Sequence, residues 1–364
     1  MEHSLLQRRQ VISAIAATVT TLGAPAVHAN TKKIRMVLGI PTMSPLVANQ
    51  TSVPAALGYY EQEGLSVDPV LAGAGGTSGA FQLVASGDQD IGSASYSPLL
   101  ARAAEGRDIG VAYFYLQLRA YAIGLSVLAD SPVTSFSQLK GKLLGVSTLG
   151  AESAKVAEAL ARMSSMNPAA DLQMIAVGTG AQAAQALRSK QVDAYMGPNS
   201  QIAQIETVGL KLRSLPIPDR LSSLFGPGLF ARRDYIEKNR AAVVGVGRAV
   251  AKGTLFMITN PEAAIRLHWK AFPQNISQSV SQEVALENAL KTIRVQVEGL
   301  RFQDDEPNAR FGEFPRKGVE ALSEVYGLTG RSPTAAQLFS NELIAEINAF
   351  DREKVIQQAK NFKA

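Results

Sequence analysis

The chain has 364 residues, of which 18% are charged, no cysteine and a formal net charge of +5 at pH 7. That length is enough for two domains with their own cores, and the small positive excess lacks the basic runs with interleaved aromatic residues typical of nucleic-acid-binding proteins. The absence of cysteine excludes disulfides and cysteine-ligated zinc.

The first 29 residues have the layout of a cleaved secretory signal. Arg8 and Arg9 form a short basic region, an uncharged apolar stretch covers 11–22, and small or aliphatic residues lead to Ala29. The apolar stretch is shorter than the roughly 20 residues that span a membrane. We therefore predict cleavage near Ala29 and an exported, periplasmic protein. The arginine pair leaves both the general and the twin-arginine export routes open.

From residue 34 onward, apolar strand patterns alternate with helical patterns, which predicts an α/β fold. In a first set we expect strands at 34–40, 65–71, 90–92 and 109–115, and helices at 53–63, 78–86 and from Ser97. In a second set we expect strands at 122–129, 143–146, 172–177, 192–196 and 210–215, and helices at 137–141, 150–164, 180–189 and 199–208. A strand at 229–232 and an almost wholly helical region at 235–362 follow, with breaks at Pro261 and Pro273.

The chain passes between the two sets twice, near 116–121 and near 224–229. We predict two lobes, each a mixed, mostly parallel sheet flanked by helices, with a helical C-terminal part. The signal peptide covers 1–29, lobe 1 covers 30–118 and 229–364, and lobe 2 covers 119–228. Two crossings form a hinge, and the cleft between the lobes is the natural ligand site.

Five segments in this order resemble one protein family over about residues 34–261: LGYYEQEGLSV (57–67), LVASGDQDIG (83–92), FSQLKGKLLGV (136–146), ALRSKQVDA (186–194) and FARRDYIEKN (230–239). The family is the nitrate, sulfonate and taurine type of ABC substrate-binding protein, which includes binders of the thiamine pyrimidine. The resemblance implies a type II periplasmic-binding-protein fold. It also implies a receptor that closes on a small molecule and passes it to an inner-membrane ABC permease with its ATPase. We expect a monomer without a cofactor.

Ligands of parallel sheets lie beyond the carboxyl ends of strands, near helix N-termini. In the glycine turn at 73–79, Gly75 and Gly76 allow close approach, and Thr77 begins a helix whose amides favour an anion. The alternatives there are a dinucleotide-binding turn and a plain tight turn. The other candidates, several of which could equally be helix caps, loop residues or core, are Thr42, Met43, Ser95, Tyr96, Tyr115, Arg119, Thr148, Glu152, Ser153, Gly197 and Asn199.

Two of these candidates bear on the charge of the ligand. Arg119 is the one cationic candidate for a sulfonate or carboxylate, although it could be a solvated loop arginine. Glu152 would repel an anion, so it either points outward or pairs with an amine on the ligand. A sulfonate- or carboxylate-like ligand is therefore the leading expectation, and an amine-bearing heterocycle such as a thiamine precursor is the alternative.

Enzymatic chemistry is not expected. After the leader the chain has a single histidine, His268, beside the only tryptophan, Trp269, so no serine–histidine–aspartate set and no metal site can be built near the cleft. Ser137 and Lys140 have the spacing of penicillin-binding enzymes but lack the companion Lys-Thr-Gly. Relatives that form the thiamine pyrimidine with pyridoxal phosphate remain an enzymatic alternative, and a sensor-type receptor is a third. The export leader and the absence of a histidine near the cleft argue against such an enzyme.

Overall fold

The computed structural model describes residues 31–119, 123–218, 225–301, 309–316, 318–319, 322 and 334–363. The expected signal peptide and parts of both crossings between the sets lie outside the described residues. The described residues belong to one compact unit, Thr31–Ala364.

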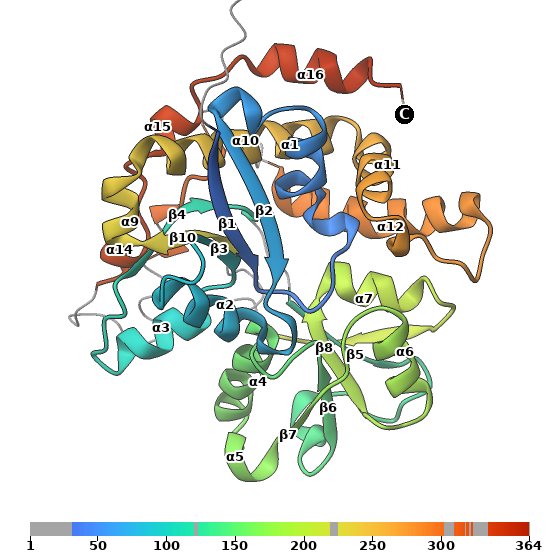
Figure 1. The fold of residues 1–364 in the computed structure, drawn as a ribbon. Coiled ribbons are helices and arrows are strands. Elements are labelled where there is room, and N and C mark those ends of the chain that lie inside the picture. Colours follow the sequence, from blue (N-terminus) through green and yellow to red (C-terminus); the bar gives the residue numbers. More distant parts are fainter. Residues whose placement is uncertain are drawn as a thin grey trace, which may run out of the picture. The chain divides into compact units, whose positions relative to one another are not determined.

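The first lobe is built on a five-stranded sheet with the order β2-β1-β3-β10-β4 (Figure 1). Its strands are β1 (Lys32–Leu38), β2 (Leu65–Leu71), β3 (Ile91–Ala94), β4 (Val111–Leu116) and β10 (Gly228–Arg232). β1 is parallel to β2 and β3, whereas β10 is antiparallel to both β3 and β4. Four of the five strands therefore run in one direction, which confirms a mixed, mostly parallel sheet.

The two faces of this sheet are covered by different helices because the side chains of a strand alternate. Ile34, Met36 and Leu38 pack in a core with α10 (Arg240–Thr259), α11 (Pro261–Ala271) and α12 (Gln282–Leu300). Val37 faces the other way, into a core with α2 (Gly76–Ala85) and α3 (Ser97–Ala104). This sheet is consequently buried on both sides.

The helix α10 is long and apolar enough to cross a membrane by length and composition alone. In the structure, 67% of its apolar window is buried within the protein. Val243, Val250 and Phe256 lie in the core against the first sheet. The apolar character of α10 is thus that of a core helix.

The second lobe is built on a sheet with the order β7-β6-β8-β5-β9, and β5 is the strand that runs in the opposite direction. Its strands are β5 (Ile123–Leu128), β6 (Leu143–Val146), β7 (Gln173–Ala176), β8 (Ala194–Pro198) and β9 (Leu212–Leu215). Its helices are α4 (Glu152–Met163), α5 (Pro168–Asp171), α6 (Ala181–Arg188) and α7 (Asn199–Glu206). Apolar cores lie on both faces of this sheet as well.

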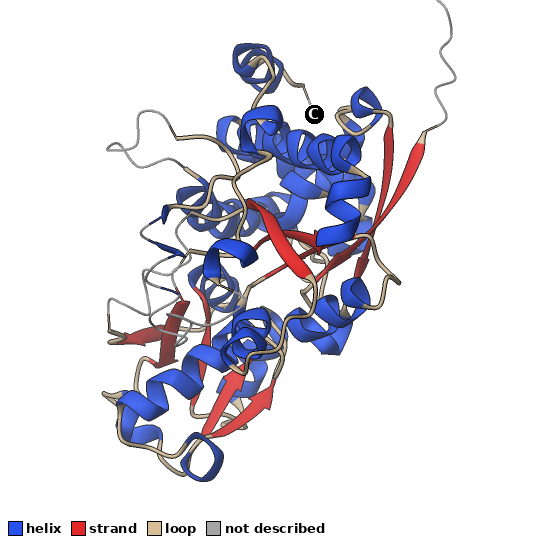
Figure 2. Cartoon of the chain, turned by 90° about the vertical axis from the view of Figure 1, so that its left-hand side faces the viewer, coloured by secondary structure: helices blue, strands red, loops and turns tan. Residues whose placement is uncertain are grey.

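The described segments of the C-terminal part are mostly helical: Figure 1 draws them as orange and red helices, and Figure 2 shows the helix that leads to the C-terminus. Its further helices are α9 (Arg233–Lys238), α14 (Ala335–Leu338), α15 (Ile344–Ile347) and α16 (Arg352–Lys360). Pro261 begins α11, where the Asn260 side chain accepts from the Ala263 amide. The helix expected at 53–63 is shorter than predicted. It is divided into α1 (Ser52–Ala56) and the 3-10 turn η2 (Glu61–Glu63), because Gly58 has a φ of +68° and ends the first helix.

Candidate ligand-binding site

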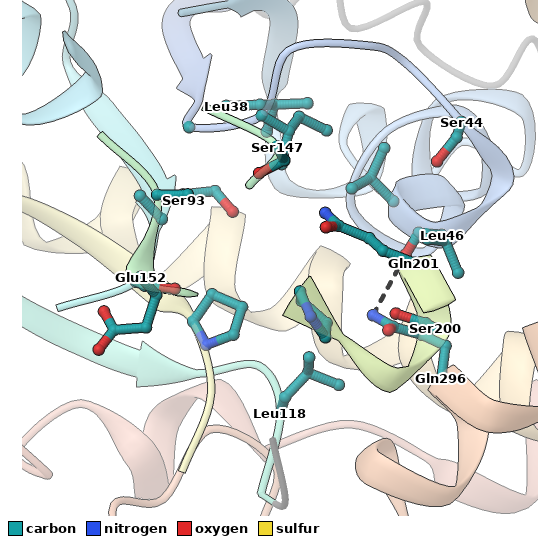
Figure 3. A pocket seen from close by; sticks show the side chains of 18 of the residues that line it. Leu38, Ser44, Leu46, Ser93, Leu118, Ser147, Glu152, Ser200, Gln201 and Gln296 are labelled. Atoms are coloured by element: carbon teal, nitrogen blue, oxygen red, sulfur yellow. Dashed lines mark hydrogen bonds between the residues drawn. The ribbon is translucent and has the colours of Figure 1, made fainter. Parts of the chain in front are cut away.

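A cavity of about 120 Å³ lies between the two lobes (Figure 3). From the first lobe it is lined by residues at the ends of β1, β3 and β4, including Leu38, Ser93 and Leu118. From the second lobe it is lined by residues that end or follow β6, β7 and β8, including Ser147 and Pro198. The cavity therefore occupies the place where parallel sheets bind their ligands.

Three helices direct their first turns at this cavity. Thr77, Ser153 and Ser200 all line it, and each is the second residue of its helix, in α2, α4 and α7 respectively. None of these helices has a side-chain hydrogen bond from its N-cap residue. The first N–H groups of a helix lack intrahelical partners and carry a partial positive charge, so this arrangement favours oxygen atoms that carry negative charge.

Ser153 is prepared to bind a polar atom. Its side chain is 2% exposed, and its Oγ has no hydrogen-bond partner among the described residues. A buried hydroxyl without a partner costs free energy, which a ligand oxygen in the cavity would recover.

A chain of side-chain hydrogen bonds fixes the first-lobe side of the cavity. Ser93 Oγ donates to Gln117 Oε1 at 2.9 Å, and Gln117 Nε2 donates to Gln50 Oε1 at 2.5 Å. The Tyr60 hydroxyl donates to the Gln50 carbonyl oxygen at 2.8 Å, which fixes the backbone of Gln50 at one end of this row of hydrogen bonds. The other carboxamide side chains in the lining are Asn49, Gln201, Gln204 and Gln296.

Glu152 carries the only formal charge among the described lining residues. Its side chain is buried, and its Oε2 accepts from the backbone N–H of Ser97 at 3.1 Å. Ser97 begins α3 of the first lobe, so a carboxylate of the second lobe complements the N-terminus of a first-lobe helix. Figure 3 shows this carboxylate turned away from Ser200 and Gln201. Glu152 therefore joins the two lobes instead of pointing outward.

The glycine turns of the two lobes touch beside the cavity. Gly150 precedes α4, and a Cβ atom added to it would lie 2.6 Å from the Gly75 carbonyl oxygen. A Cβ atom on Gly76 would collide with the Thr148 hydroxyl. The close approach of these turns requires glycine at both sites.

The predicted candidates fall into several groups. Thr42, Thr77, Ser95, Glu152 and Ser153 line the cavity. Gly75, Gly76 and Thr148 form the contact between the turns, and Gly197 and Asn199 flank the lining residues Pro198 and Ser200. Met43 lines a second cavity.

The remaining three candidates, Tyr96, Tyr115 and Arg119, belong neither to the cavity linings nor to the contact between the turns. Tyr96 and Tyr115 are 1% exposed and lie in the two cores of the first lobe, and every residue of β4 around Tyr115 is buried. Arg119 Nη1 donates to the Glu313 carbonyl oxygen at 3.4 Å. The described lining therefore contains no cationic side chain.

The carboxamide side chains and Ser200 were not among the residues predicted from the sequence. Ser200 could have been found, because it holds the same position in its helix as Thr77. Gln50, Gln117 and Gln296 come from three distant segments, and no local pattern brings them together.

A family model described as NMT1/THI5 like matches residues 51–264. A protein of Bordetella bronchiseptica RB50 has a similar structure, with a TM-score of 0.68 and 22% identity over 87% of this chain and 96% of that chain. Comparison with curated protein sequences gives no match.

Two further structures share the fold. One is the periplasmic aliphatic sulphonate binding protein SsuA from Escherichia coli, with a TM-score of 0.57 and 18% identity over 82% of this chain and 86% of that chain. The other is the periplasmic nitrate-binding protein NrtA from Synechocystis PCC 6803, with a TM-score of 0.58 and 15% identity over 92% of this chain and 99% of that chain. These likenesses establish the two-lobed fold of periplasmic binding proteins.

Proposed function

The chain belongs to the NMT1/THI5-like family, and on this premise we propose that it is the solute-binding receptor of an ABC importer. It captures a small polar or anionic organic molecule between its two lobes. The observation that carries this proposal is the convergence of three helix N-termini, with Thr77, Ser153 and Ser200, on one interlobe cavity.

A ligand with a single negative charge spread over several oxygens fits this site best. The helix termini and hydroxyls offer several N–H and O–H donors, and no cation lines the cavity among the described residues. The Glu152 carboxylate is directed at the α3 terminus, which reduces its repulsion of an anion. These features support a sulfonate- or carboxylate-like head group.

The alternative ligand is a thiamine-pyrimidine-like heterocycle. The carboxamides of Gln50, Gln117 and Gln201 favour it, because each can both donate to and accept from ring nitrogens and amino groups. An enzyme that forms such a pyrimidine is less well supported. His268 is fully buried between Ser52 and Asn275, and neither a histidine nor a lysine is among the described lining residues.

The same proposal extends to location and partners. The protein acts in the periplasm as a monomer, after removal of residues 1–29, and passes its ligand to an inner-membrane permease with its ATPase. The leader-like N-terminal sequence and the periplasmic relatives of the same fold support this view.

A thermal-shift screen with sulfonates, carboxylates, oxyanions and pyrimidines tests the proposal. A molecule that binds only the folded state must raise the melting temperature. For the molecule that does so, Thr77→Val should weaken binding. Glu152→Gln should strengthen binding of an anion but weaken binding of an amine-bearing heterocycle, since it removes one negative charge. If both variants bound that molecule as the wild type does, the cleft would not be its site.

A further inference from the structure

A second cavity, of about 490 Å³, lies beside the cleft cavity and is larger than it. We propose that this second cavity, here called the annex, receives an apolar or aromatic part of the same ligand whose polar head binds in the cleft. The ligand is then an amphiphilic molecule. This inference rests on the proposed receptor function and adds the shape and chemistry of the ligand's second half.

The annex and the cleft cavity share part of their walls. Ser44, Leu46 and Gln204 line both cavities, so the two spaces adjoin at these residues. The Leu46 carbonyl oxygen accepts from Gln296 Nε2 at 3.5 Å, which ties this boundary to the cleft wall on α12. A ligand bound in the cleft would extend into the annex by displacing these side chains.

The annex wall combines uncharged polar residues with an apolar part that is suited to apolar groups. None of its described lining residues is charged. Met43 and Leu46 line it from the segment after β1, Trp269 lines it from α11, and Ala289 and Ile293 line it from α12. An aromatic ring and a flexible thioether both adapt to apolar partners of varied shape.

The annex lining includes exposed apolar side chains. Val208, which follows α7 in the second lobe, is 43% exposed, and Val280, which precedes α12 in the first lobe, is 40% exposed. Exposed aliphatic side chains in the lining of a cavity leave apolar surface in water that a bound ligand would cover. Since the two valines come from different lobes, an apolar group between them would also favour closure.

One polar residue of the wall, Asn275, is held by a neutral hydrogen-bond network. Asn275, which lines the annex, lies 3.1 Å from His268 Nε2, and His268 Nδ1 lies 3.1 Å from Ser52 Oγ. Burial lowers the pKa of His268 to about 4, so the imidazole is neutral at physiological pH. This network holds Asn275 without introducing a charge.

The test uses linear alkanesulfonates from methanesulfonate to octanesulfonate, with the affinity measured by calorimetry. The affinity should rise about threefold to fourfold for each methylene that enters the annex. Trp269 is the only tryptophan of the sequence, and its side chain is 6% exposed in the annex wall. Its emission should change with the longer chains and not with methanesulfonate.

Ala289→Phe provides the decisive variant, because it fills the annex from α12 without altering a residue of the cleft lining. The affinity of this variant for methanesulfonate should be within twofold of that of the wild type. Its affinity should not rise as the alkyl chain becomes longer. Ala170→Phe is the matched control, since Ala170 is exposed on α5 and lines neither cavity. The affinity of this control should rise with chain length as that of the wild type does.

The outcomes separate the two proposals. If methanesulfonate binds and longer chains bind no better, the annex inference is overturned and the receptor function stands. A gain with chain length that survives in Ala289→Phe overturns the annex inference too, because the tail must then lie elsewhere. If no member of the series binds, both the annex and the anionic head group are excluded.

Discussion

Three buried serine hydroxyls, those of Ser97, Ser126 and Ser153, have no hydrogen-bond partner among the described residues. Their surroundings differ. Ser126 is fully buried within β5, whereas Ser153 is the second residue of α4 and lines the cleft cavity. Removing the hydroxyl of Ser153 or that of Ser126 deletes the same chemical group, but only the Ser153 hydroxyl lies where a ligand could reach it. A comparison of the two variants therefore tests whether Ser153 binds the ligand.

We predict that Ser153→Ala lowers the affinity for the cleft ligand about fivefold to fiftyfold, as expected for one hydrogen bond to a neutral or charged partner. The melting temperature without ligand should change little, because the hydroxyl has no protein partner to lose. Ser126→Ala is the control, and its affinity should equal that of the wild type in the same calorimetric titration. Equal losses in the two variants would show that Ser153 does not touch the ligand.

His268 should make the stability depend on pH. Its pKa is about 4 in the folded protein and 6.5 when exposed, so the unfolded chain binds the proton more readily. Its contribution to the free energy of unfolding is complete above pH 6.5 and decreases as the pH falls toward 4, by up to about 3 kcal/mol.

Urea unfolding at intervals between pH 7.5 and 4.5 measures this effect. His268→Gln cannot take up the proton, so its curve should be flatter than that of the wild type over this range, even if the variant is less stable throughout. Parallel curves would mean that His268 does not titrate in this way.

Residue by residue, some of the candidates predicted from helix starts are among the residues that line the cleft cavity. Thr77 and Ser153 follow glycine turns after strands, and this pattern is local in the sequence. Tyr115 was expected near the ligand because it lies close to the first crossing, but burial of the whole of β4 directs its ring into the core. Side-chain direction in a strand buried on both faces depends on packing that sequence does not specify.

Among the elements, the two glycine turns matter most for closure. Gly150 does not have the positive φ that disfavours other residues, and an added Cβ atom there would meet its closest obstacle at the Gly75 carbonyl oxygen of the other lobe. We predict that Gly150→Ala folds with an unchanged melting temperature and binds the cleft ligand about tenfold more weakly, because the lobes cannot approach fully.

Gly79→Ala is the matched control for this prediction. Gly79 lies in α2 of the opposite turn, and an added Cβ atom would make only an ordinary contact of 3.7 Å with Ala72. Its affinity should equal that of the wild type, with slightly higher stability because alanine favours helix. Small-angle X-ray scattering with ligand should show the more open form for Gly150→Ala alone.

The sequence predicted several elements well and one poorly. The strands at 65–71 and 143–146 have the predicted bounds, since apolar runs between glycines or charged residues define them locally. The helix at 53–63 was expected to be continuous, but Gly58 adopts a positive φ and interrupts it. Glycine is compatible with both conformations, so only the tertiary structure decides between them.

For the molecule as a whole, the register of β4 and β10 predicts that the first lobe can fold without the second. Leu116 pairs with Gly228, and the amide of Gln117 donates to the Pro227 carbonyl oxygen at 2.9 Å. The second lobe is thus inserted where a two-residue hairpin loop would fit. Replacing residues 117–227 with Asn-Gly should give a first lobe that folds alone and unfolds in one cooperative transition, measured by circular dichroism. A molten or aggregated product would show that the first lobe needs the second.

At this scale the sequence predicted the two lobes and the cleft, because alternating strand and helix patterns and two crossings are visible along the chain. It did not predict the annex. Val208, Trp269 and Val280 come from separate segments of both lobes and meet only through the packing of α7 against α12. Cavities between elements distant in sequence arise from that packing.

The position of β10 between β3 and β4 also governs the order in which the protein can be completed on the ribosome. When β4 has been synthesised, the edges of β3 and β4 that face β10 still lack their hydrogen-bond partners. The segment that completes them follows the whole second lobe. The helix α10, which packs against Ile34, Met36 and Leu38, and α16, which packs on α10, follow later still. The strands of the second lobe are contiguous in sequence, so the second lobe is completely synthesised before the first. The first lobe, whose synthesis starts earlier, is completed last.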